Sequence, residues 1–168
     1  MDFLSIAARV LCIADLVLCW YALYRKEGWV AKAKAQRPDF EIPAALFRYD
    51  GERLNRCFFP KVGEDAEPVH RILLYGFALL PGVGAALLLC AALVMKTSWV
   101  QVGAYIAAAI ALVFSLSENG LLVGALRQEP RRDKLCRYAG ACGLVKWVAL
   151  GLWLVALFAS LFVSAAKL

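Results

Sequence analysis

The fold is decided by the stretch from Trp99 to Ala125, which reads WVQVGAYIAAAIALVFSLSENGLLVGA. A bilayer core is crossed by about 20 apolar helical residues, so this run is long enough for one membrane-spanning helix with some tilt. Its only charged residue is Glu118. A carboxylate inside a membrane helix is disfavoured by roughly 2.5–3.5 kcal/mol on insertion scales. We therefore expect Glu118 to face protein or water and not lipid.

Small residues share the helical face of Glu118. At steps of three and four they are Ser115, Ala111, Ala108 and Ala104. A stripe of this kind lets a neighbouring helix come close. Asn119 follows Glu118 directly, and Gly120 and Gly124 add the GxxxG spacing found in packed membrane helices. This face is predicted to contact other helices.

The whole chain has the composition of a membrane protein. Of its 168 residues, 62% are hydrophobic, and the mean hydropathy is +0.66. The net charge of +6 comes from basic residues beside apolar runs, so we assign them to topology and lipid headgroups and not to nucleic acid. The single histidine, His70, excludes a bis-histidine haem and argues against a histidine-rich metal site. No cofactor is expected.

The apolar pattern predicts an all-α polytopic membrane protein, a bundle of four transmembrane helices at about 3–24, 72–95, 99–126 and 143–166. Asp15 interrupts the first run, which has neither a positive n-region nor a cleavage site, so we expect it to be retained as a membrane helix. Pro81, Gly82 and Gly84 lie in the second run and predict a kink or break used in helix packing. Lys146 interrupts the fourth.

A charged connector of 47 residues, 25–71, separates the first two runs and holds ten Lys/Arg and eight Asp/Glu. Helix is expected to continue through Glu27–Gln36 and stop before Pro38, because the residue preceding a proline avoids the helical region. A second, short amphipathic helix is expected over 43–59, in the membrane interface or with its aromatic side chains against a partner. The sequence leaves open whether the connector is a solvated link or a docking surface.

The positive charges predict an orientation. Fifteen of the nineteen Lys/Arg lie in 25–71 and 127–142, so the positive-inside rule places both segments on the cytoplasmic, matrix or stromal side. Both chain ends then lie on the opposite side of the membrane. We expect this membrane to be a bacterial inner membrane or the inner membrane of an organelle. Cys57 and Cys136 would face the reducing side, and no disulfide is expected.

Three charged residues are predicted to share one depth. Counted from the basic residues at the helix ends, Asp15, Glu118 and Lys146 each lie roughly 13–15 Å from the inner border, with Ser115 and Asn119 nearby. Three interpretations remain open. The cluster binds or relays a proton or polar solute, it is an inert pair that sets helix register, or one charge pairs with another subunit.

The function expected from these features is that of a non-enzymatic accessory or assembly subunit of a larger membrane complex. Its partners would be membrane lipids and other membrane subunits or a second copy. The alternative is a small proton- or solute-conducting channel or transporter that uses Asp15, Glu118 and Lys146. An enzyme ranks third, because the chain has no HExxH, GxSxG, phosphate-gripping glycine loop or Cys/His pair.

Overall fold

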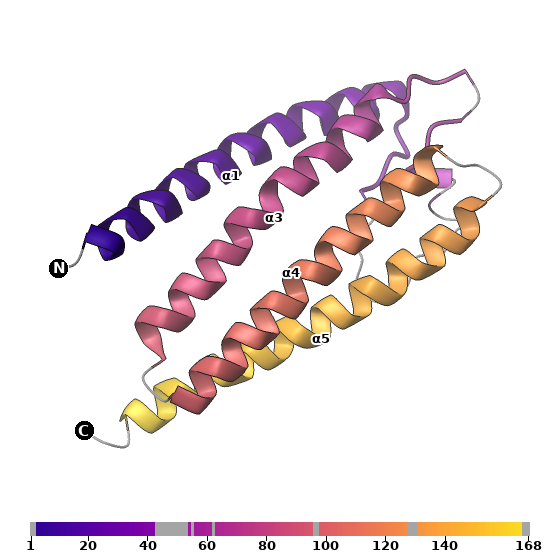
Figure 1. Ribbon diagram of the computed structural model, residues 1–168. Coiled ribbons are helices and arrows are strands. Elements are labelled where there is room, and N and C mark those ends of the chain that lie inside the picture. The colour runs from indigo at the N-terminus through magenta and orange to yellow at the C-terminus, as the bar shows by residue number, and fades with distance from the viewer. Residues whose placement is uncertain are drawn as a thin grey trace.

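The computed structural model describes residues 3–42, 54, 56–61, 63–95, 98–127 and 131–165. Four long helices follow one another, namely α1 (Phe3–Gln36), α3 (Glu67–Val94), α4 (Ser98–Arg127) and α5 (Arg132–Ala165) (Figure 1). The predicted all-α class is confirmed for this part of the chain. By length and composition, α3, α4 and α5 are able to cross a membrane. Among the described residues α1 does not meet the same criterion.

The helices lie in a row that follows the chain. Successive helices run antiparallel, which brings the start of α1 and the end of α5 to the same end of the molecule (Figure 1). α4 packs most extensively against α5, and α1 packs against α3, while a smaller contact between α3 and α4 joins the two pairs. Within the described residues α1 touches neither α4 nor α5. The assembly is therefore open along α1.

Several helix ends differ from the prediction. α1 runs on to Gln36, as expected, but α3 begins at Glu67 and α5 at Arg132, five and eleven residues before the predicted starts at 72 and 143. The apolar pattern marks only the part of a helix suited to lipid, whereas charged residues such as Lys134 and Arg137 extend a helix into water. α3 also continues through Pro81 to Val94, so of the predicted kink or break the break does not occur. A membrane helix tolerates a proline when neighbouring groups satisfy the freed carbonyl.

The aromatic end of the connector is buried, although most of the other residues described between α1 and α3 are exposed. Phe58 and Phe59 are 1% and 0% exposed, and they belong to one buried cluster that also contains residues of all four helices. The helical members are Ala33, Val69, Ile72, Leu73, Leu122, Ala125, Cys136 and Ala139. We call this cluster the connector core. Most of the short helix predicted over 43–59 lies outside the described residues, but its aromatic end is buried and not available to a partner.

Arg37 fastens the connector to α1. Its side chain is buried, with 6% of the residue exposed, and its Nη1 donates to the Phe59 carbonyl oxygen at 2.9 Å. Asp39 and Glu64 supply carboxylate oxygens 3.5 and 3.6 Å from its guanidinium. From α5, the guanidinium of Arg132 lies 4.9 Å from the centre of the Phe59 ring. Arg37, directly after α1, thus contacts the Phe59 backbone, and Arg132 at the start of α5 contacts the Phe59 ring.

A second buried cluster fills the other end of the molecule. It is built on the small-residue stripe of α4, where Ala104, Ala107 and Ala108 are buried together with Trp153 of α5. Ala91 and Met95 at the end of α3 complete it. The small side chains of α4 leave the room that the large indole ring occupies.

Candidate functional site

The structure brings two of the predicted intramembrane charges together. Lys146 of α5 donates from Nζ to Oε2 of Glu118 on α4, in an ion pair that is largely buried. Glu118 is only 4% exposed. A buried carboxylate is strongly disfavoured unless it is paired and hydrogen-bonded, and this contact supplies the pairing.

Gly143 makes room for this ion pair, although Gly143 was not among the residues predicted for the site. A Cβ atom at Gly143 would lie 3.1 Å from Oε1 of Glu118, which is tight for a carbon–oxygen contact. The sequence does place Gly143 three residues before Lys146, on the same face of a helix, which is the pattern from which its role could have been predicted.

A cavity of about 320 Å³ lies beside the pair, and all four helices and the connector contribute to its wall. Its apolar lining comes from Ile42, Phe58, Ile72, Leu73, Leu80, Leu122 and Trp147, together with Gly76. Its polar lining comes from Lys26, Ser115, Glu118, Asn119 and Lys146. Three of the four residues that the sequence placed around Glu118, namely Ser115, Asn119 and Lys146, therefore share one cavity with it.

Lys26 is the charged residue of the site that was not predicted from the sequence. It projects from α1, and burial lowers the pKa of its ammonium group. No described residue forms an ion pair or hydrogen bond with Lys26, and the same holds for Ser115 and Asn119. The outward-facing Ser117 differs, because its hydroxyl donates to the Val113 carbonyl oxygen at 2.9 Å.

Asn119 packs directly on α3. A Cβ atom at Gly76 would come within 2.8 Å of its Nδ2 atom, so glycine at this position lets the amide lie between the two helices. The amide therefore stands at the junction of α3 and α4, facing the cavity that Lys26 enters from α1.

Asp15 is not part of this site. It lies opposite Gly82, where an added Cβ would be 3.2 Å from the Asp15 carbonyl oxygen. Gly82 is six residues, about 9 Å, along α3 from Gly76, which contacts Asn119. The predicted single level of Asp15, Glu118 and Lys146 is therefore wrong. Counting residues from the basic helix ends took no account of how far one helix is displaced along its neighbour.

The predicted packing glycines fall on different faces. Gly82 lies against α1, and a Cβ at Gly84 would be 3.3 Å from the side chain of Leu112 on α4. A Cβ at Gly124 would be 3.6 Å from Leu135 of α5, whereas Gly120 is exposed with nothing within 4 Å. Pro81, beside Gly82, is exposed.

The arrangement is suited to binding. In the part of the chain that the structure describes, no group of three His, Cys, Asp or Glu residues could hold a metal ion, and the five described cysteines are free thiols. The cavity is lined by the ammonium group of Lys26, the hydroxyl of Ser115 and the amide of Asn119, none of which has a partner among the described residues. Beside them the charges of Lys146 and Glu118 compensate each other.

Comparison with protein-family models, with curated proteins and with solved structures found no match to this chain.

Proposed function

We propose that the protein is an integral membrane accessory or assembly subunit of a larger complex, without catalytic activity, and that α1 is its docking helix. One observation carries the proposal. Among the described helices α1 packs against α3 alone, and its carboxylate Asp15 has no hydrogen bond or ion pair with any described residue. An unpaired carboxylate in a membrane helix is disfavoured, and a cation on a neighbouring chain would relieve that cost.

The remaining surface of α1 supports this role. Large apolar side chains point outward on several of its faces, and those of Ile13, Val17 and Trp20 are each more than half exposed. Among the described helices, only α3 covers a face of α1. Lipid or a second protein covers the rest, and Asp15 favours a protein.

We extend the proposal to topology. α1 crosses the membrane with its apolar part, residues 3–24, which gives four crossings with α3, α4 and α5. Both long connectors then lie on one side, and their Lys/Arg content favours the cytoplasmic, matrix or stromal side of a bacterial or organelle inner membrane.

The test is co-purification from the native membrane in mild detergent. Wild-type protein should migrate with other chains, and Asp15→Leu should migrate alone because the charge that a partner holds is gone. Ser117→Leu is the matched control, since it replaces an exposed polar side chain on α4 that bonds only within its own helix. It should leave the complex intact.

The alternative, a small conductor of protons or solute, is supported by the polar cavity alone, since Asp15 lies apart from it. Purified protein reconstituted into vesicles distinguishes the two. If the protein alone moves protons or solute and Ser115→Leu, which fills the cavity, abolishes the flux, the accessory role is wrong.

A further inference from the structure

The cavity lies at the depth of lipid headgroups and not at the membrane centre. A hydrocarbon core of about 30 Å takes about 20 helical residues. Counted from Trp99, which is 85% exposed at the start of α4, such a span ends at Asn119. Counted back from Met95 at the end of α3, it ends at Tyr75. Asn119 lines the cavity, and Tyr75 directly precedes Gly76, which lines it too.

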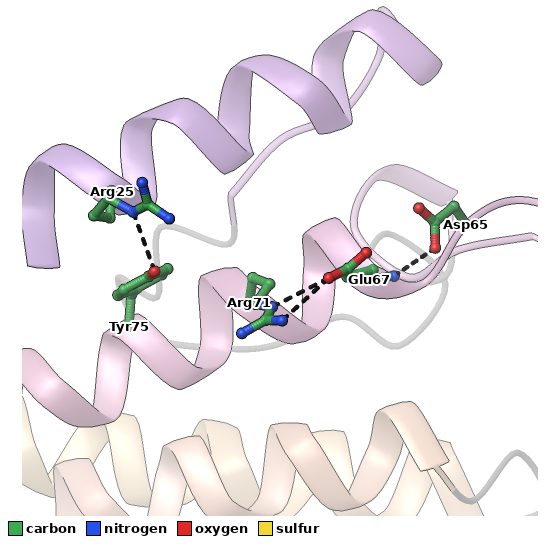
Figure 2. A network of polar contacts seen from close by, with 5 residues as sticks. All are labelled: Arg25, Asp65, Glu67, Arg71 and Tyr75. Atoms are coloured by element: carbon green, nitrogen blue, oxygen red, sulfur yellow. Dashed lines mark hydrogen bonds and ion pairs between the residues drawn. The ribbon is translucent and has the colours of Figure 1, made fainter.

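Side chains typical of a membrane interface gather at this same level on α1 and α3. Arg25 donates from Nε to the Tyr75 hydroxyl oxygen at 3.4 Å, and Arg71 pairs with Glu67 at 3.2 Å one turn further on (Figure 2). Trp29 lies one turn after Arg25 on α1, and the guanidinium of Arg71 is 5.7 Å from the centre of its ring. Aromatic and basic residues are enriched where helices leave the hydrocarbon. Lys26 follows Arg25 directly and points into the cavity.

The charge of the cavity is unbalanced. Lys146 neutralises Glu118, so the cation of Lys26 is left without a counterion among the described residues. Ser115 and Asn119 add hydroxyl and amide donors on the same wall. A phosphate group accepts hydrogen bonds from all three kinds of donor, and bonds to an ionised group are stronger than neutral ones.

We infer that this cavity binds the phosphate-bearing headgroup of an anionic lipid, with Lys26 as the counterion and Ser115 and Asn119 as hydrogen-bond donors. The volume of about 320 Å³ is at the lower end of the range of small-ligand sites, so it admits a headgroup and not two acyl chains. Leu80 lines the side nearer the membrane centre, where a chain would leave. No contact joins α1 to α4 or α5 in the described residues, so no helix pair closes the cavity on that side. This inference depends on the membrane location and not on the accessory role.

The experiment measures lipid binding to the full chain in non-ionic detergent. Phosphatidylglycerol and phosphatidylcholine are titrated separately, and bound lipid is counted by native mass spectrometry. Wild-type protein should hold one phosphatidylglycerol about tenfold more tightly than phosphatidylcholine, and Lys26→Gln should remove that preference. Lys32→Gln is the matched control, because it removes the same charge from an exposed position of the same helix. It should bind within about twofold of wild type, a change worth less than 0.5 kcal/mol.

A second variant and a soluble competitor sharpen the test. Ser115→Leu fills the cavity without changing charge and should also lose phosphatidylglycerol, while its melting temperature shows whether the bundle has formed. Glycerol phosphate identifies the source of the phosphate. Competition with the lipid that depends on Lys26 would identify a soluble phosphate ester as the occupant, and no competition identifies the membrane lipid. Equal binding of the two lipids by wild type, or equal losses in Lys26→Gln and Lys32→Gln, would overturn the inference.

Discussion

Single residues set the properties of the charged site. Glu118 is held by Lys146 from the neighbouring helix and has Gly143 beside it, so its carboxylate is enclosed by α5. The sequence predicted a small-residue face around Glu118 and grouped Lys146 with it in one polar cluster. It could not place Lys26 there, because the position of Lys26 depends on how α1 and α3 slide along each other. The close contact between α1 and α3 is at Gly82, and no periodic pattern in the sequence marks that position.

The ion pair should show strong coupling. We expect Glu118→Gln alone to lower the yield of folded protein more than Glu118→Gln combined with Lys146→Met. Removing one member leaves a buried charge without its partner, which costs ~3–5 kcal/mol, whereas replacing both is often close to neutral. A double-mutant cycle on thermal unfolding in detergent measures the coupling, and additive losses would show that the two groups do not interact.

At the scale of the helices, the four long helices and their order were predicted, whereas their ends were not, and only α3, α4 and α5 meet the criterion for a membrane span in the described residues. The stretch 132–142 is helical although most of its residues are polar or small, because helix formation in water does not require an apolar face along its whole length. Similarly, α3 passes through Pro81 without ending. Hydropathy indicates where a helix meets lipid, which is a shorter interval than the helix itself.

The contact between α1 and α3 depends on one glycine. In Gly82→Ala the new Cβ would lie 2.1 Å from Cys19 Sγ and 3.2 Å from the Asp15 carbonyl oxygen, so α1 must move away. Because α1 has no second helix to hold it, we expect the buried Cys19 thiol to become reactive toward a maleimide, with modified residues located by mass spectrometry. Gly103→Ala, in open space on α4, is the control and should leave Cys19 protected. Protection of Cys19 in both variants would show that the helices tolerate the added methyl group.

For the whole molecule, the connector core joins the two helix pairs. Its residues come from every helix and from the connector, while α3 and α4 share only a modest contact of their own. None of this could be foreseen from residues 25–71, whose charges suggested exposure. The burial of Phe58 and Phe59 depends on apolar surface from Leu122 and Cys136, more than sixty residues away in the chain.

Arg37 should be the most sensitive charged position of the connector. Arg37→Met removes the donor to the Phe59 carbonyl oxygen and both carboxylate contacts, and we expect a loss of about 1.5–3 kcal/mol in stability. Thermal unfolding should occur at lower temperature, and the connector should be cut sooner by trypsin. Lys34→Met, one turn earlier on the exposed side of α1, should behave as wild type. Equal melting of the two variants would contradict this role for Arg37.

The connector core also imposes an order on biosynthesis. Phe59 leaves the ribosome about 80 residues before Ala139, the last member of the cluster that buries it. At about 5–20 residues per second, the delay is roughly 4–16 s. During that interval two adjacent aromatic rings have no finished pocket, because only α1 is complete when Phe59 emerges and α3, α4 and the start of α5 are still to be synthesised. Sequestration of these rings by a chaperone or the insertion machinery would therefore be needed until the final hairpin arrives.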